Sequence, residues 1–267
     1  MIQNKRSKTL GQNFLIDKNI VFKILKAAEI THNDTVIEIG PGKGALTDEL
    51  IKTSGKIICV EIDNELAANL ADKYSIFSNI TIVNENFIFT DISAFLTQNT
   101  IFIGNLPYSV STRIISKTLL FNKFIKHCVF MIQKEVAQRI CATPESGKIH
   151  GALSILTRAH FQPEYLFDVS SNCFSPKPEV ISSVIKLMPV NRNLPGDFNY
   201  NLFEKFVFSA FANKRKTLIN SILNNSSINK ETISNALLSL NLNPDIRAEQ
   251  IGIEGFLKMF EKIYKSL

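Results

Sequence analysis

The chain has 267 residues, of which 45% are hydrophobic, and a formal net charge of +6. This length permits a full hydrophobic core and suggests one large domain with a smaller one. No apolar run reaches the roughly 18 residues of a membrane span, and none follows the basic residues near the N-terminus, so we expect neither a transmembrane protein nor a signal peptide. The four cysteines lack the spacing of a zinc site or a disulfide framework, which is typical of the reducing cytoplasm.

Strands and helices are predicted to alternate after a polar, basic segment and an amphipathic helix with Ile20, Ile24, Leu25 and Ala28 on one side. The predicted strands lie near residues 35–40, 56–62, 80–84, 100–104, 127–132, 164–169 and 180–187. The predicted helices lie near residues 44–53, 64–74, 111–121, 134–142 and 150–160. This alternation indicates βαβ units in a mostly parallel sheet. Because the last two strands have a short connection, we expect an antiparallel hairpin at one edge.

Residues 189–197 have the composition of a linker. Beyond them, over residues 198–267, the apolar spacing is helical throughout. The apolar positions are Phe203, Phe206, Val207, Ala210, Leu218, Ile222, Ile233, Leu237, Leu238, Phe256, Met259, Phe260 and Ile263. We therefore expect an α/β domain over residues 1–188 and a small all-α domain at the C-terminal end.

A glycine turn follows the first predicted strand, with Gly40, Gly42 and Gly44 at alternate positions and a helix expected to begin near Gly44. Glycines allow a tight turn and close approach of a ligand to the backbone. The second strand ends in Glu61, which is placed to accept hydrogen bonds from a ribose. The spacing differs from the dinucleotide fingerprint, and Glu38 suits an ammonium group better than a pyrophosphate. The pattern favours S-adenosylmethionine, with a nicotinamide dehydrogenase as the alternative.

The fourth predicted strand is followed by Asn105-Leu106-Pro107-Tyr108. Asn105 offers an amide oxygen as an acceptor, the proline restrains the preceding backbone, and Tyr108 supplies a flat face. At the carboxyl end of a strand these groups can form a slot for a planar amine. An adenine amine is a poor nucleophile, so accepting its hydrogens and positioning it are the expected means of catalysis. The alternative, a structural turn, would be favoured if the motif stood elsewhere.

Residues 92–134 contain no Asp or Glu but five cations, which are Arg113, Lys117, Lys123, Lys126 and Lys134. Together with the positive net charge, this run predicts a phosphate-binding rim beside the site. The alternative is a solvated face of ordinary lysines.

Asn105-Leu-Pro-Tyr108 and Glu38-Ile-Gly-Pro-Gly42 resemble motifs of the rRNA adenine N6-dimethyltransferases. Further similar motifs lie at Lys8–Leu15, Gln133–Ala137, Phe174–Val180, Ala210–Leu218 and Arg247–Glu249. The last two resemble the small-subunit (16S) enzymes of the KsgA type. The macrolide-resistance enzymes that act on large-subunit rRNA tend to carry Asn-Ile-Pro-Tyr and to lack the basic Lys-Arg-Lys-Thr-Leu helix.

This resemblance implies a Rossmann-like class I methyltransferase sheet of seven strands. Residues 1–188 would form the S-adenosylmethionine-binding catalytic domain, with residues 1–16 as its lid segment, and residues 198–267 an rRNA-binding domain. Cofactor-binding roles are implied for Asn13, Leu15, Gly40, Gly42, Glu61, Asn86 and Asn105. Catalytic roles are implied for Asn105, Leu106, Tyr108 and Phe174, and Phe174 would stack on the flipped adenine. The alternative for Phe14 and Phe174 is that they are core aromatics among 20 phenylalanines.

One position departs from the family pattern. Where the family usually has an acid that accepts a hydrogen bond from the adenine amine of the cofactor, this chain has Asn86. A neutral amide oxygen accepts a weaker bond, so we expect looser cofactor binding without loss of activity. Glu85 could take this role if the alignment shifts by one residue.

The resemblance predicts dimethylation of two adjacent adenosines in the 3′-terminal hairpin of small-subunit (16S) rRNA during ribosome biogenesis. The expected partners are small-subunit rRNA and the pre-30S particle, and we expect a cytoplasmic monomer without a metal. A large-subunit rRNA methyltransferase and a mainly non-catalytic ribosome-assembly factor are the alternatives.

Overall fold

The computed structural model describes residues 12–192, 194 and 198–264, and these residues form two compact units. The first unit comprises the described residues of Met1–Ala137 and Phe161–Pro189, and the second those of Gln138–His160 and Val190–Leu267. No helix in the described part of the chain is long and apolar enough to cross a membrane.

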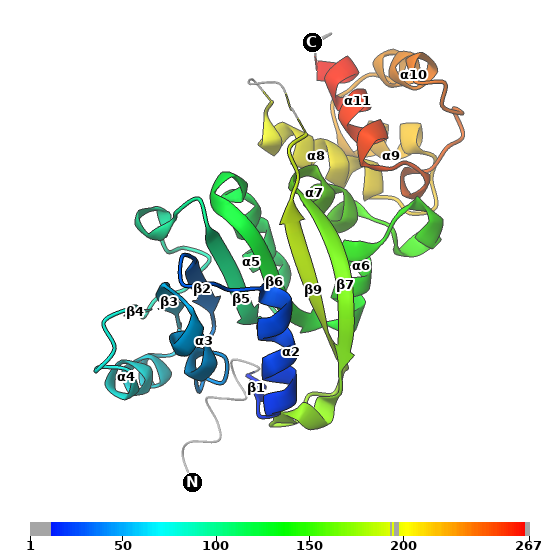
Figure 1. Cartoon of the computed structure of the whole chain (residues 1–267). Helices are drawn as coiled ribbons and strands as arrows, with labels where there is room; N and C mark the ends of the chain where they lie inside the picture. Colours follow the sequence, from blue (N-terminus) through cyan, green and yellow to red (C-terminus); the bar gives the residue numbers. More distant parts are fainter. Residues whose placement is uncertain (1–11, 193, 195–197, 265–267) are drawn as a thin grey trace. The chain divides into compact units, whose positions relative to one another are not determined.

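A seven-stranded sheet forms the centre of the first unit, in the order β4-β3-β2-β5-β6-β9-β7 (Figure 1). Its strands are β2 (Thr35–Ile39), β3 (Lys56–Val60), β4 (Ile80–Val83), β5 (Thr100–Asn105), β6 (Ile125–Gln133), β7 (Phe161–Val169) and β9 (Ser182–Pro189). Neighbouring strands from β4 to β6 pair in parallel, whereas β9 is antiparallel to both β6 and β7. The predicted mostly parallel sheet with an antiparallel pair at one edge is confirmed. Strand order reverses between β2 and β5, which is where open α/β sheets bind ligands.

Helices cover the sheet in the first unit, and their bounds are α2 (Lys18–Ala28), α3 (Thr47–Thr53), α4 (Asn64–Lys73), α5 (Ser111–Leu119) and α6 (Lys134–Cys141), which continues into the second unit. On one face, Ile24 of α2 and Leu50 of α3 pack with Ile57 and Ile103 of the strands. On the other, Phe102 contacts Phe87 and Phe121. Burial of apolar side chains on both faces therefore explains the nearly continuous apolar runs of these strands.

A two-stranded sheet that we did not predict joins β1 (Phe14–Leu15) and β8 (Phe174–Ser175) in antiparallel pairing. Short 3₁₀ helices lie at Ser93–Phe95, Asn122–Phe124, Pro144–Ile149, Ser171–Cys173 and Ala248–Gln250. In α2 the buried residues are Ile20, Val21, Ile24 and Ala28, and Leu25 is partly buried against the same core cluster.

The second unit consists of helices α7 (Ala152–His160), α8 (Tyr200–Phe211), α9 (Leu218–Asn225), α10 (Lys230–Ser239) and α11 (Ile253–Tyr264), together with the C-terminal part of α6. Rings of α8 and α11, such as Phe203, Phe206 and Phe260, pack against one another in its core. The predicted apolar positions are buried there, except Leu238, which is exposed.

We predicted that the first domain ends at residue 188, whereas the second compact unit also includes residues Gln138–His160. Ile155, Leu156 and Ala159 of α7 are buried in the same cluster as Phe203, so α7 groups with the C-terminal helices. We placed the helix near residues 150–160 in the α/β domain because it lies between two predicted strands. Its apolar face is instead buried among the C-terminal helices, which places α7 in the second unit. Strand β9 extends to Pro189, and residues 193 and 195–197 of the predicted linker lie outside the described residues.

Gly104→Ala is expected to lower the free energy of unfolding by about 1–3 kcal/mol, because the close approach of β5 to β2 leaves no room for a side chain. A Cβ atom at Gly104 would lie 2.5 Å from the main-chain oxygen of Ile39. Urea denaturation followed by circular dichroism measures the change. Gly252→Ala is the control, since its Cβ would meet its nearest atom, Cγ of Pro144, at 3.7 Å. Equal losses in the two variants would contradict this account.

Candidate functional site

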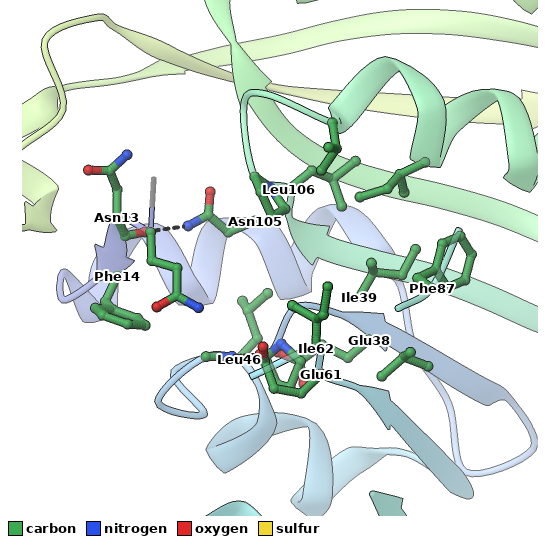
Figure 2. Close-up of a pocket in the computed structure, with 18 of the residues that line it drawn as sticks. Asn13, Phe14, Glu38, Ile39, Leu46, Glu61, Ile62, Phe87, Asn105 and Leu106 are labelled. Atoms are coloured by element: carbon green, nitrogen blue, oxygen red, sulfur yellow. Dashed lines mark hydrogen bonds between the residues drawn. The ribbon is translucent and has the colours of Figure 1, made fainter. Parts of the chain in front are cut away.

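A pocket lies at the carboxyl ends of β2, β3, β4 and β5, where the loops that follow these strands meet the N-terminal segment (Figure 2). Parallel strands end at the same edge of a sheet, so loops that are distant in sequence come together there. The pocket is lined by residues 12–15, 38–43, 45, 46, 60–62, 85–88, 105–110 and 114. All predicted site residues except Phe174 are among them.

The glycine turn after β2 adopts the backbone conformation that its glycines allow. Gly40, Gly42 and Gly44 have φ angles of +66°, +60° and +84°, which side chains with a Cβ rarely adopt. A Cβ atom at Gly42 would lie 3.0 Å from Cδ1 of Phe14, and one at Gly44 would lie 2.5 Å from the hydroxyl of Tyr74. The prediction that a helix begins near Gly44 is wrong, because α3 begins at Thr47.

Glu61 holds this turn in place with its carboxylate. Its Oε2 accepts a hydrogen bond from the Gly42 N–H at 3.0 Å, and its Oε1 accepts one from the Asp63 N–H at 3.0 Å. Burial raises the pKa of Glu61, against the effect of these two bonds. Each carboxylate oxygen has a second lone pair, so Glu61 can accept ribose hydroxyls from the pocket that it lines.

Glu38 lines the same pocket, but its side chain is only 1% exposed. Its Oε2 accepts a hydrogen bond from the Thr47 hydroxyl at 2.7 Å and one from the Cys59 thiol at 3.7 Å. Burial raises the pKa of Glu38 to about 7. We expected an acid turned toward an ammonium group, whereas in this structure the carboxyl group bonds to Thr47 and Cys59.

Asn105, at the end of β5, connects the sheet to the N-terminal segment. Its Nδ2 donates a hydrogen bond to the main-chain oxygen of Asn13 at 2.8 Å (Figure 2). None of the described residues donates to its Oδ1, so this oxygen can accept a hydrogen bond from a ligand. Leu106 is buried, and its N–H donates to the Met131 oxygen at 3.0 Å. The Asn-Leu-Pro-Tyr turn is therefore anchored to the neighbouring strand, as the proposed slot requires.

Tyr108 lines the pocket with its hydroxyl tied to the sheet. The Tyr108 hydroxyl lies 2.5 Å from Oγ of Ser182, the first residue of β9. Burial raises the pKa of Tyr108, against the effect of its hydrogen bond with Ser182. The ring is thus restrained at both its backbone and its hydroxyl end.

Phe174 does not reach the pocket. It is 3% exposed, and β8 pairs it with Leu15 of β1. Its ring packs in the core cluster that also holds Leu15 and Val169. In this arrangement Phe174 cannot stack on a base, because its ring would first have to leave the core cluster.

Asn86 lines the pocket at the start of a turn after β4. Its Oδ1 accepts a hydrogen bond from the Ile88 N–H at 3.0 Å, which fixes the orientation of the amide. The second lone pair of Oδ1 can still accept from a ligand. Glu85 lines the pocket as well, so both residues that we considered for the adenine amine are present.

Three of the five cations in the cation-rich run make contacts within the protein. Lys117 donates to the Phe87 oxygen at 2.6 Å and also to the Thr90 oxygen. Lys126 pairs with Asp34, and Lys134 pairs with Asp168. The run contains no acid, but Asp34 and Asp168 come from outside it, and only the folded chain brings them to these lysines.

Several apolar pocket residues were missed by the sequence argument, including Ile62, Phe87 and Val110. Phe14 was placed in the N-terminal lid motif without a site role of its own, with a core position as the alternative, and its ring lines the pocket with Nζ of Lys43 4.8 Å from its centroid. Each of these residues lies within a few positions of a motif residue, at the end of a strand or in the N-terminal segment. This closeness to the motif residues is the sequence signal by which they could have been found.

Glu38→Gln is expected to remove a pH dependence of stability. The folded pKa of Glu38, about 7, lies above the ordinary value of 4.5. Between these values the unfolded chain releases the proton while the folded chain retains it, so the free energy of unfolding falls as pH rises from about 4.5 to 7 and changes no further above that range. The whole effect is about 3 kcal/mol. Urea denaturation of both proteins from pH 4.5 to 8 measures it, and parallel curves would contradict this account.

Known proteins resemble this chain over almost its whole length. The model of a family described as ribosomal RNA adenine dimethylase matches residues 3–265. A Clostridium botulinum protein named ribosomal RNA small subunit methyltransferase A is 38% identical over 265 residues, which cover 98% of this chain and 96% of the relative. A Fusobacterium nucleatum protein of the same name is 36% identical over 259 residues, covering 96% and 97%.

Two solved structures show the same likeness. A dimethyladenosine transferase from Plasmodium falciparum superposes with a TM-score of 0.82 at 25% identity, covering 94% of this chain and 98% of that one. The 23S rRNA methyltransferase ErmE superposes with a TM-score of 0.72 at 26% identity, covering 94% and 100%. The chain belongs to the ribosomal RNA adenine dimethylase family.

Proposed function

We propose that this protein transfers methyl groups from S-adenosylmethionine to the N6 amines of two adjacent adenosines in the 3′-terminal hairpin of small-subunit (16S) rRNA, giving N6,N6-dimethyladenosine. The observation that carries the proposal is one continuous pocket lined by Glu61 and Asn86 as well as by Asn105 and Tyr108. The names of the relatives at 36–38% identity support the small subunit as the target. We further propose a cytoplasmic monomer that acts on the pre-30S particle during ribosome biogenesis, with the helical unit binding rRNA.

The polar groups that line the pocket fit the cofactor. Glu61 would accept hydrogen bonds from the ribose hydroxyls, and Asn86 would accept one from the adenine amine. The turn at Gly40 and Gly42 presents main chain without side chains to the methionine part. Asn13 and Leu15 would cover the cofactor from the N-terminal segment, which Asn105 holds through its bond to Asn13. When bound, S-adenosylmethionine supplies a methyl group on a positively charged sulfur.

The Asn105 turn would position the target amine. The free Oδ1 of Asn105 and the main-chain oxygen of Leu106 would accept the two hydrogens of N6, which helps to localise its lone pair. The ring of Tyr108, restrained through Ser182, would support the face of the base. No strong base is needed, because the amine proton becomes acidic only as the new N–C bond forms. Catalysis would come mainly from positioning and exclusion of water.

Phe174 would complete the base site only after a rearrangement. Since β8 pairs with β1, the side chain of Phe174 is held beside Leu15 of the N-terminal segment. We propose that binding of RNA releases Phe174 from this cluster so that it can stack on the flipped adenine.

Labelled methyl transfer tests the proposed function. Tritiated S-adenosylmethionine is incubated with small-subunit particles, large-subunit particles and free rRNA, and the nucleosides are then analysed. Dimethyladenosine in small-subunit material is expected. Label in large-subunit RNA would instead support the second candidate, which the likeness to the 23S rRNA methyltransferase ErmE favours. Binding to particles without label would indicate an assembly factor.

Asn105→Ala is expected to lower the methyl-transfer rate by about 100-fold or more, since it removes a positioned hydrogen-bond acceptor at the reacting amine. Single-turnover transfer to small-subunit particles measures the rate. Tyr108→Phe is the companion variant, because it keeps the ring and removes only the bond to Ser182, and a smaller loss is expected. A rate within threefold of wild type for Asn105→Ala would exclude Asn105 from the reaction.

Asn86→Asp is expected to tighten S-adenosylmethionine binding by roughly fivefold, because a charged acceptor makes a stronger hydrogen bond to the adenine amine. Isothermal titration calorimetry measures the affinity, and Glu85→Gln serves as the control for the neighbouring acid. Unchanged affinity in Asn86→Asp would show that Asn86 does not contact the adenine amine. A loss only in Glu85→Gln would transfer this role to Glu85.

A further inference from the structure

Hydrogen bonds hold the turn that carries Asn86 both from within and from α5. Within the turn, the N–H groups of Phe89 and Thr90 donate to the main-chain oxygen of Asn86 at 2.9 and 3.0 Å. The Thr90 hydroxyl donates to the same main-chain oxygen at 2.8 Å. From outside, Lys117 of α5 donates to the oxygens of Phe87 and Thr90. Lys117 therefore fastens the turn to α5.

Phe89 projects from this turn into solvent. Phe89 is 76% exposed, whereas Phe87 and Thr90 of the same turn are buried. The guanidinium carbon of Arg113, also on α5, lies 5.9 Å from the centre of the Phe89 ring. None of the described acids forms an ion pair with Arg113. The ring is thus positioned by its turn, and its cationic neighbour has its charge available.

Both elements that carry this pair also line the pocket. Phe87 and Ile88 of the turn, and Val110 and Ile114 next to α5 and within it, face the cavity. The pair therefore lies beside the pocket at the surface, close to where RNA must approach if its adenosine is to enter. Single-stranded RNA is recognised largely by bases stacking on exposed aromatic rings and by arginine.

We propose that Phe89 and Arg113 form a nucleotide-stacking subsite for the rRNA strand beside the target adenosine. An unpaired base would stack on the open face of the Phe89 ring, and Arg113 would contact the phosphate of the same nucleotide. Base stacking is tolerant of sequence, so the subsite would orient the strand without selecting its bases. The inference rests on the proposed function, because it requires an RNA strand to reach this pocket.

The alternative is an ordinary cation–aromatic contact on the surface. Such contacts are common in proteins and weak when exposed to water. The two accounts differ in what they predict, because only a subsite makes the affinity for RNA depend on the flat ring.

The test compares variants of the full chain in binding to unmethylated small-subunit particles. Phe89→Ala is expected to weaken binding about tenfold, whereas Phe89→Trp should stay within threefold of wild type because it keeps a stacking face. Arg113→Ala should lower the slope of log affinity against log salt by about 0.7, the value for one phosphate on a single strand. Ile76→Ala, which removes an 84% exposed side chain between α4 and β4, and Lys123→Ala are the matched controls, for which no change is expected.

S-adenosylmethionine affinity, measured in parallel by calorimetry, separates a subsite from a distorted turn. It should be unchanged in Phe89→Ala, and a comparable loss would show that the variant acts through Asn86. Particle affinity of Phe89→Ala equal to wild type would overturn the subsite while leaving the proposed function intact. If the wild-type protein labels only large-subunit RNA, the proposed function fails, and the same variants measured on that RNA decide the subsite.

Discussion

The bond between the Glu61 carboxylate and the Gly42 N–H joins the end of β3 to the turn after β2, and the rest of the pocket is built on that edge. It requires glycine at positions where φ is positive and a buried acid whose pKa burial raises. Because β5 lies on the other side of β2, its Asn105 turn opens onto the same cavity. Parallel pairing thus brings the Glu61 carboxylate and the Asn105 amide, the proposed acceptors for a ribose and an amine, to a single pocket from residues far apart in sequence.

The N-terminal segment closes this pocket through two contacts of different kinds. Its main chain accepts the Asn105 amide at Asn13, and its Leu15 pairs with Phe174 of β8. A base that needs the Phe174 ring would disturb the second of these contacts. Ligand binding and the position of this segment are therefore coupled in the proposed enzyme.

The lysines near the site show how position changes the meaning of a charge. Lys117 serves the turn that carries Asn86, and Lys126 and Lys134 are paired with acids. A count of charges along the chain does not distinguish these lysines from Arg113, whose guanidinium lies over the exposed ring of Phe89. The folded chain separates cations that support the scaffold from one that can meet RNA.

The sequence by itself determined the seven strands of the large sheet, the order of the site motifs and the family, because strand runs, glycine turns and Asn-Leu-Pro-Tyr are local patterns. Only the tertiary structure decided that α7 belongs with the C-terminal helices, that α3 begins at Thr47, and that Glu38 bonds to Thr47 and Cys59. It likewise decided that Phe174 lies in the core. These outcomes depend on which apolar faces pack together and which polar groups are buried away from water. The spacing of residues along the chain does not specify either.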